Sequence, residues 1–93
     1  MDEFKARQLT QMRFAIADFR EEKISLNMLL SRLEGAAGAV GQEFWEQNVY
    51  DRALELEQIN ADLLEERRAL TPSEQMQVET LIARLESQLS QVD

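Results

Sequence analysis

The sequence predicts an all-α fold, an antiparallel four-helix bundle that forms a single domain over residues 1–93. Apolar residues recur at helical spacing along the whole chain, and no stretch alternates with the period of two that a strand requires. Residues that break helices are few: Gly35, Gly38, Gly41 and the single Pro72. These observations predict helices over residues 3–21, 25–37, 42–69 and 72–91, with short connections between them.

The first predicted helix is defined by one apolar stripe. Its apolar residues are three or four positions apart and therefore share a face: Leu9, Met12, Ile16 and Phe19. Phe14 lies nearly opposite this stripe, so we expect it to be exposed. An isolated exposed aromatic residue is common on protein surfaces. The alternative is that Phe14 contacts a partner or a second copy of the chain.

The second predicted helix begins with a capping residue and ends in a glycine-rich stretch. The hydroxyl of Ser25 is expected to accept a hydrogen bond from a free amide of the first turn. Apolar residues follow at helical spacing: Leu26, Leu29, Leu30, Leu33 and Ala37. From Gly35 to Gly41 the side chains are mostly small and glycine weakens a helix, so we expect a frayed end and a turn. Close packing against another helix is the alternative use of such small residues.

The third predicted helix is the longest, and the fourth has the clearest start. One face of the third helix carries its apolar residues: Trp45, Val49, Leu56, Ile59, Leu63 and Leu70. Thr71 is expected to be the N-cap of the fourth helix, with Pro72 in the first position and Glu74 completing a capping box. The fourth helix continues with its own apolar stripe: Val78, Leu81, Ile82, Leu85, Leu89 and Val92.

Composition excludes several classes of function. The chain has no cysteine, which removes disulfides and thiolate metal sites, and no histidine, which removes the usual general base and the commonest metal ligand. We therefore expect no enzyme activity, no cofactor and no metal. The chain does not open with a basic segment, an apolar run and a cleavage site, and it has no apolar run of about 18 residues. A cytoplasmic location without membrane attachment is predicted.

The negative charge of the chain lies almost entirely in one segment. The formal net charge is −8, and residues 41–66 contribute −7 because they hold eight acids against Arg52 alone. The eight acids are Glu43, Glu46, Asp51, Glu55, Glu57, Asp62, Glu65 and Glu66. Charge spread this unevenly attracts a basic partner and speeds encounter with it. Nucleic acid is an unsuitable partner, because phosphate contacts need clusters of Lys and Arg that are absent here.

A helical wheel divides these acids into two groups. Five of them point outward together, and we call them the acidic ridge: Asp51, Glu55, Asp62, Glu65 and Glu66. The other three, Glu43, Glu46 and Glu57, surround two apolar residues, Tyr50 and Leu54. An aromatic contact ringed by charge is typical of an interface anchor.

The acidic ridge has two alternative interpretations. One is a solvated helix face that keeps the protein soluble. Against it, like charges on one helix face destabilise the helix by about 0.2–0.5 kcal/mol per pair, and no lysine is interleaved to relieve them. The other is a catalytic or metal-binding pair of carboxylates. That use needs groups that point inward into a concave, partly desolvated setting, whereas these acids point outward.

A pattern of residues along the chain resembles that of a known family. It consists of Ile24-Ser25-Leu26, Leu29/Leu30, Leu33-Glu34, Trp45 and Leu56-Glu57-x-x-Asn60-Ala61. The pattern is similar to that of small acidic all-helical immunity proteins encoded beside bacterial polymorphic toxins of the contact-dependent or Rhs type. The chain departs from that pattern at Asn60, where an aromatic residue is expected, and at Ala53, where a second large side chain is expected.

The resemblance implies a cytoplasmic inhibitor that binds one cognate toxin domain tightly and has no catalytic activity. The acidic segment agrees with this class, because toxins that act on nucleic acids or nucleotides present basic clefts that an acidic helix can occlude. We therefore predict an immunity protein, a monomer or weak dimer, whose partner is a cognate toxin with a basic surface. Its partner-binding residues are predicted to be the acidic ridge together with Glu43, Glu46, Tyr50, Leu54 and Glu57. The alternative prediction is a helical adaptor or self-associating structural module.

Overall fold

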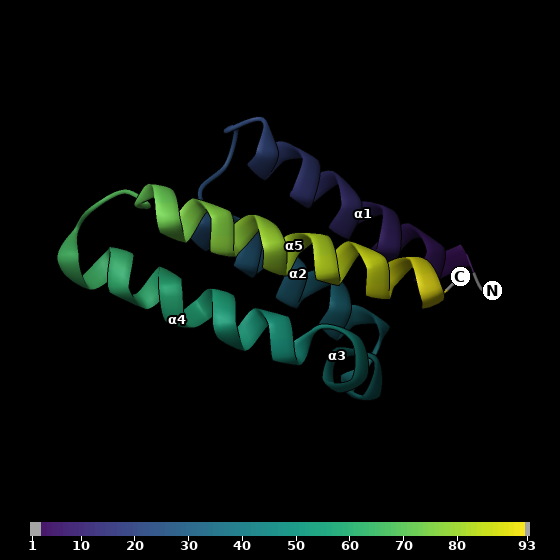
Figure 1. Ribbon diagram of the computed structural model, residues 1–93. Helices are drawn as coiled ribbons and strands as arrows, with labels where there is room; N and C mark the ends of the chain where they lie inside the picture. The colour runs from purple at the N-terminus through teal and green to yellow at the C-terminus, as the bar shows by residue number, and fades with distance from the viewer. Residues whose placement is uncertain (1–2, 93) are drawn as a thin grey trace.

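The computed structural model describes residues 3–92, and the chain is helical nearly throughout that range. Five helices follow one another: α1 (Glu3–Arg20), α2 (Leu26–Val40), α3 (Gln42–Asn48), α4 (Tyr50–Glu66) and α5 (Pro72–Val92) (Figure 1). No strand occurs between residues 3 and 92. The predicted all-α class is confirmed, but the structure has five helices where the sequence predicts four.

The four longer helices lie side by side, and the short α3 lies at one end of the molecule (Figure 1). Along the chain, α1 packs on α2, α2 on α4, α4 on α5, and α5 returns to α1. Consecutive long helices run in opposite directions. The molecule is elongated as a result, with extents of 41 × 24 × 18 Å.

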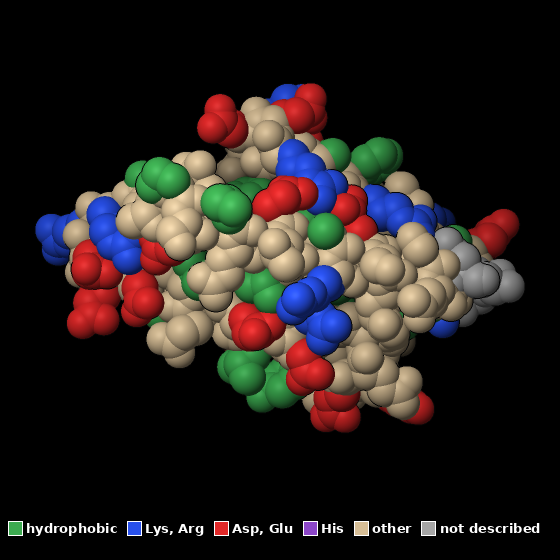
Figure 2. Space-filling view, in the orientation of Figure 1, with side chains coloured by type: hydrophobic (Ala, Val, Ile, Leu, Met, Phe, Trp, Pro, Cys, Tyr) green, Lys and Arg blue, Asp and Glu red, His purple; other side chains and the backbone are tan. Residues whose placement is uncertain are grey.

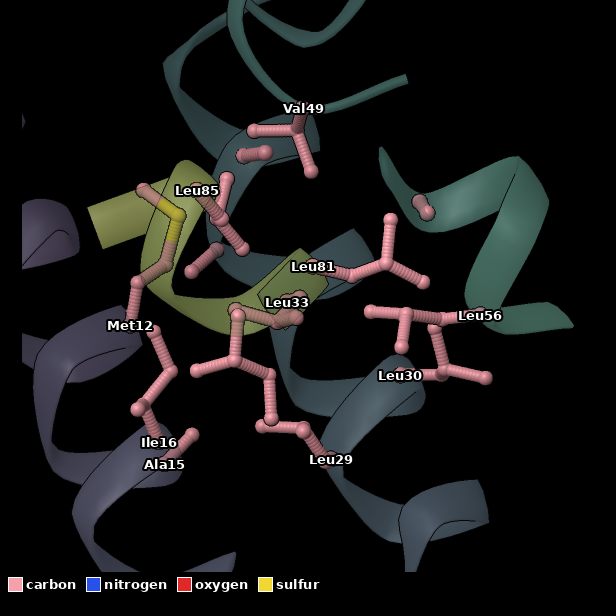
Figure 3. Close-up of a cluster of buried hydrophobic side chains, with 14 of the residues drawn as sticks. Met12, Ala15, Ile16, Leu29, Leu30, Leu33, Val49, Leu56, Leu81 and Leu85 are labelled. Carbon is pink, nitrogen blue, oxygen red and sulfur yellow. The ribbon is translucent and has the colours of Figure 1, made fainter. Parts of the chain in front are cut away.

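One apolar core holds these helices together. The stripe predicted for the first helix is confirmed, since Leu9, Met12 and Ile16 are completely buried. Figure 3 shows side chains from α1, α2, α4 and α5 meeting in this core, Leu33 and Leu56 among them. Full burial of a leucine or isoleucine side chain contributes about 1.5–3 kcal/mol. The packing of this core therefore determines which face of each helix points toward solvent.

The helix predicted over residues 42–69 is interrupted at Val49, so this prediction is wrong. Val49 leaves helical geometry with φ −123° and ψ −37°, and α4 begins at the next residue. No glycine or proline marks the break. Both Phe44 and Val49 are buried in the core, whereas Trp45 is only half-buried. The turn at Val49 lets α3 cross the end of the molecule and bury Phe44. This break results from packing between helices, so the periodicity of one predicted helix could not show it.

The end of the same predicted helix also differs from the expectation. The last residue of α4 is Glu66 and not residue 69, because Arg67 adopts the left-handed conformation with φ 52°. The backbone amide of Arg68 then donates a hydrogen bond to the carbonyl of Leu63 at 3.2 Å, which satisfies an acceptor at the helix end. Leu70 still packs against the core from the connection that follows.

The second helix extends further than predicted, to Val40 instead of residue 37. Ala36 and Ala37 are buried, so packing holds the helix together through the glycine-rich stretch. It ends at Val40 and is followed by Gly41, whose φ of 148° is a conformation that side chains disfavour. The expected turn is therefore confined to this last glycine.

Both predicted caps are confirmed. The hydroxyl of Ser25 accepts a hydrogen bond from the amide of Met28 at 3.1 Å. At the start of α5, Thr71 Oγ1 accepts from the amide of Glu74 at 3.1 Å, and Glu74 Oε1 accepts from the amide of Thr71 at 3.0 Å. These reciprocal bonds define a capping box. The guanidinium of Arg68 binds the same carboxylate and, with the capping bonds, lowers the pKa of Glu74 to about 2.

Candidate functional site

The predicted partner-binding residues are divided between two helices. Glu43 and Glu46 lie on α3, and all the others lie on α4. Because the chain turns at Val49, the helical wheel relates only the residues of α4 to one another. Figure 2 shows acidic side chains along the edge of the molecule that α3 and α4 form, with exposed hydrophobic atoms between them.

The acidic ridge lies on the solvent side of α4. Four of its five members are exposed and Asp62 is half-buried. Within residues 3–92, only Glu66 of the ridge forms an ion pair, with Arg68 Nε at 3.1 Å from its Oε2 atom. The other four carboxylates form no ion pair in that range: Asp51, Glu55, Asp62 and Glu65. Their charge is therefore free to act on another molecule.

A second charged cluster provides a useful contrast. On the side where α1 meets α5, Arg20 lies between two acids of α5. Its Nε atom donates to Glu79 at 3.0 Å and its Nη1 atom donates to Glu86 at 2.8 Å. These hydrogen bonds raise the pKa of Arg20 above its usual value. The carboxylates of this cluster are neutralised within the fold and connect two helices. Most of the ridge carboxylates on α4 form no ion pair of this kind.

Tyr50 and Leu54 are exposed, as the sequence predicts. The exposed fractions are 44% for Tyr50 and 51% for Leu54. The Tyr50 ring meets the Trp45 ring edge to face, with their centres 6.2 Å apart, so α3 helps to orient it. Exposed apolar side chains beside unpaired acids are a suitable anchor for a partner.

The acids of α3 are held in place by neighbouring amides of the same helix. Gln47 donates to Glu43 at 3.1 Å, and Gln42 donates to Glu46 at 2.9 Å. Both carboxylates are exposed. They add negative charge at the α3 end of the molecule, but they are not part of the α4 surface.

Glu34 of α2 belongs to this region, although it is not among the predicted partner-binding residues. Its carboxyl meets that of Glu57 across the boundary between α2 and α4. The hydrogen bond with Glu57, partial desolvation and the charge of Glu57 together raise the pKa of Glu34 to about 7. Because the two residues come from different helices, no spacing in the sequence could have linked them.

Leu64 also lies outside the predicted set of partner-binding residues, and 61% of its surface is exposed. It lines an open groove of about 660 Å³ where α2, α4 and the connection to α5 meet. The lining of the groove is largely apolar, and its polar members include Asn27 and Asn60, which are joined by a 2.9 Å hydrogen bond, together with Arg67 and Arg68. A second open groove, of about 620 Å³, lies between α1 and α2 beside Phe14, which is 60% exposed.

The part of the chain that the structure describes contains no group of three or more acids placed to hold a metal ion. None of its helices combines the length and the apolar character needed to cross a bilayer. Comparison with protein-family models, with curated proteins and with solved structures found no match. Function is therefore inferred from the surface of α4 and the residues around it.

Proposed function

We propose that the chain is a cytoplasmic immunity protein of a bacterial toxin system. It binds its cognate toxin domain and occludes a basic surface with the acidic face of α4, and it has no catalytic activity of its own. The observation that carries the proposal is the set of ridge carboxylates that form no ion pair within residues 3–92: Asp51, Glu55, Asp62 and Glu65.

Unpaired charge of one sign on a rigid helix steers an oppositely charged protein toward it and suppresses encounters with acidic proteins. A helical scaffold with a packed core loses little conformational entropy on binding, which favours a tight complex. A toxin that acts on phosphate-containing substrates needs a basic cleft. The acidic ridge is complementary to a cleft of that kind.

Charge reversal on the ridge tests the proposal directly. The variant carries Asp51→Lys, Glu55→Lys and Asp62→Lys, and binding is measured by surface plasmon resonance against the toxin domain encoded beside the gene. We expect binding to be abolished while the helical circular dichroism spectrum is retained, because these side chains lie outside the core. Unchanged affinity would mean that the ridge is a solvated face only.

A matched control separates local charge from net charge. Glu3, Glu21 and Glu22 are exposed acids on α1 and the turn that follows it, away from the ridge. Reversing these three to lysine changes the net charge by the same amount. We expect this control to bind nearly as tightly as the natural chain. Equal loss in both variants would indicate general charge attraction in place of a specific surface.

Salt provides an independent test on the natural chain. Raising the ionic strength from about 0.01 M to about 0.15 M shortens the Debye length from about 30 Å to about 8 Å. We expect the association rate to fall steeply over that range and the dissociation rate to change little. An association rate that is flat across the range contradicts the electrostatic part of the proposal.

The second candidate is an adaptor or self-associating module, and Phe14 is the observation that favours it. This aromatic residue is largely exposed beside the open groove between α1 and α2. Light scattering over a range of concentrations distinguishes the two candidates. A mass that rises with concentration and returns to that of the monomer in Phe14→Ser favours self-association, whereas a constant monomer mass favours the immunity protein.

A further inference from the structure

A second line of residues on α4, distinct from the acidic ridge, has the spacing of a helix-packing surface. Its members recur at intervals of four, three, four and three, and we call this line the outer seam: Tyr50, Leu54, Glu57, Ala61 and Leu64. Residues at such intervals share one stripe of a helix, as in the contact line of a coiled coil. At about 1.5 Å per residue, the seam is about 21 Å long.

No helix of the described chain covers this seam. The three large apolar members, Tyr50, Leu54 and Leu64, are 44%, 51% and 61% exposed. They lie on the same helix as the fully buried Leu56, so α4 presents one apolar face to the core and a second one to solvent. At the Leu64 end, the seam runs into the groove of about 660 Å³, where a large apolar side chain of another molecule has room to enter.

The middle of the seam is acidic. Glu57 occupies its central position and meets Glu34 of α2 there. Within residues 3–92, neither carboxylate forms an ion pair with a lysine or arginine. A cation placed between them would neutralise both charges, so the centre of the seam favours lysine or arginine from an incoming surface.

The neighbouring face of α2 leaves room for that surface. Gly38 lies one turn beyond Glu34 on the same side of α2. A Cβ atom added at Gly38 would meet no atom within 4 Å, so packing within the fold does not require glycine there. Glycine inside a helix costs about 0.5–1 kcal/mol relative to alanine, and it permits close approach of another backbone.

Charge excludes a second copy of this chain as the occupant. Two copies paired about a two-fold axis along the seam would bring Glu57 and Glu34 of both copies into one interface. Each copy also carries a net charge of −8. Gathering like charges in a shared, desolvated contact is strongly unfavourable. The occupant must therefore be a different molecule with basic character.

We propose that the outer seam receives one basic amphipathic helix of the partner protein. Apolar side chains of that helix rest on Tyr50, Leu54 and Leu64, and a central lysine or arginine faces Glu57 and Glu34. The inference deepens the proposed function and rests on it in one respect, that the partner is a basic protein. It adds the kind of element that binds and the position at which it binds.

A designed peptide tests the inference in place of the partner itself. The probe has about 18 residues, enough to follow the seam, with leucines at intervals of four and three, one central arginine, and lysine and glutamine elsewhere. A control peptide has the same composition with the leucines scattered around the helix. Affinity is measured by fluorescence anisotropy with the full chain, and the binding position by changes in backbone amide chemical shifts.

We expect the striped peptide to bind at least tenfold more tightly than the control peptide. Its amide shift changes should lie along the outer seam and around Glu34 and Gly38. The double substitution Leu54→Ser and Leu64→Ser should weaken binding at least tenfold without loss of helicity. Gly38→Leu should also weaken it, because the new side chain fills the space where the peptide backbone approaches.

The matched control uses two exposed apolar residues elsewhere. Phe14 and Met76 are 60% and 74% exposed and lie outside α4, so Phe14→Ser with Met76→Ser should leave peptide affinity unchanged. Equal affinity of the two peptides, shift changes confined to the acidic ridge, or equal loss in the two serine pairs would each overturn the inference. The proposed function would survive these results, since it depends on the salt response and on the charge reversal of the ridge.

Discussion

Leu54 and Leu56 lie two residues apart on α4, yet Leu56 is completely buried and Leu54 is 51% exposed. The buried face of α4 contains apolar residues that meet α2 and α5 in the core, with Asn60 as its one polar member. The outward faces contain unpaired acids and a line of apolar residues. Residue type alone does not distinguish these surfaces, because both contain leucine.

The comparison separates the residues that stabilise the fold from those available to a partner. A buried leucine contributes to the free energy of unfolding, whereas an exposed one beside unpaired acids contributes almost nothing to it. Such residues are free to serve binding. The two faces of α4 should therefore respond to substitution in opposite ways, one in stability and the other in binding.

The largest difference is expected between two leucine truncations on the same helix. Leu56→Ala should lower the free energy of unfolding by about 2–5 kcal/mol, because it removes buried methyl groups and leaves a cavity. Leu54→Ala should change it by less than about 0.5 kcal/mol. Urea denaturation followed by circular dichroism measures both. Similar losses for the two variants would show that the two faces of α4 contribute equally to the free energy of unfolding.

A smaller effect is expected for the polar member of the buried face. Asn60 donates a 2.9 Å hydrogen bond to Asn27 of α2. Asn60→Ala should lower the free energy of unfolding by about 1 kcal/mol, the usual net contribution of one hydrogen bond. The double variant with Asn27→Ala should cost less than the sum of the single changes. Strict additivity would mean that the bond does not connect the two helices in solution.

The Glu34 and Glu57 pair should make stability depend on pH. Folding raises the pKa of Glu34 from 4.5 to about 7, so between these values the folded chain binds more protons than the unfolded chain. This contribution is fully present below pH 4.5 and is lost as the pH rises through 7. Glu57→Gln should remove this fall in the free energy of unfolding and make the variant more stable than the natural chain at pH 8. Urea denaturation at pH 4.5 and pH 8 tests this.

The control for that measurement is Glu55→Gln, an exposed acid on the ridge. It removes the same charge from the same helix but leaves the pair intact. We expect its decline between pH 4.5 and pH 8 to match that of the natural chain. If the free energy of unfolding of Glu57→Gln fell by the same amount between pH 4.5 and pH 8, this would show that the two carboxyl groups do not interact.

The smallest effect is expected on the acidic ridge. Replacing Glu55 and Asp62 with their amides relieves repulsion between like charges on one helix face and leaves Asp51 in the first turn of α4. The free energy of unfolding should rise by only about 0.2–0.5 kcal/mol per relieved pair. In contrast, Glu79→Gln with Glu86→Gln should lower it by up to about 1 kcal/mol, because Arg20 loses its partners. A loss of stability in the ridge variant would mean that the ridge has a structural role.

Features that depend on local interactions could be predicted from the sequence. The capping box of Thr71 and Glu74 was predictable because its donors and acceptors lie three residues apart. The outward position of the acidic ridge follows from helical periodicity within α4, and the structure agrees for its exposed members. These features do not depend on how the helices pack.

Features that depend on packing between helices could not be predicted in this way. The break at Val49 has no local signal, and it exists because the core accommodates both Val49 and Phe44. The contact between Glu34 and Glu57 joins two helices whose relative rotation is set by the core. Leu64 was recognisable in principle, because its spacing from Tyr50 and Leu54 continues one stripe.

The break at Val49 also changes the electrostatics of the acidic segment. Each helix has a macrodipole whose positive end lies at its N-terminus, and an acid in the first turn gains about 0.3–1 kcal/mol from it. A continuous helix would place only Glu43 in that position. Two shorter helices place Glu43 in the first turn of α3 and Asp51 in the first turn of α4. The interruption thus gives Asp51 a favourable position, whereas it leaves Glu46 in the last turn of α3, near the negative end of that helix. Glu43 and Asp51 both remain exposed to an approaching partner.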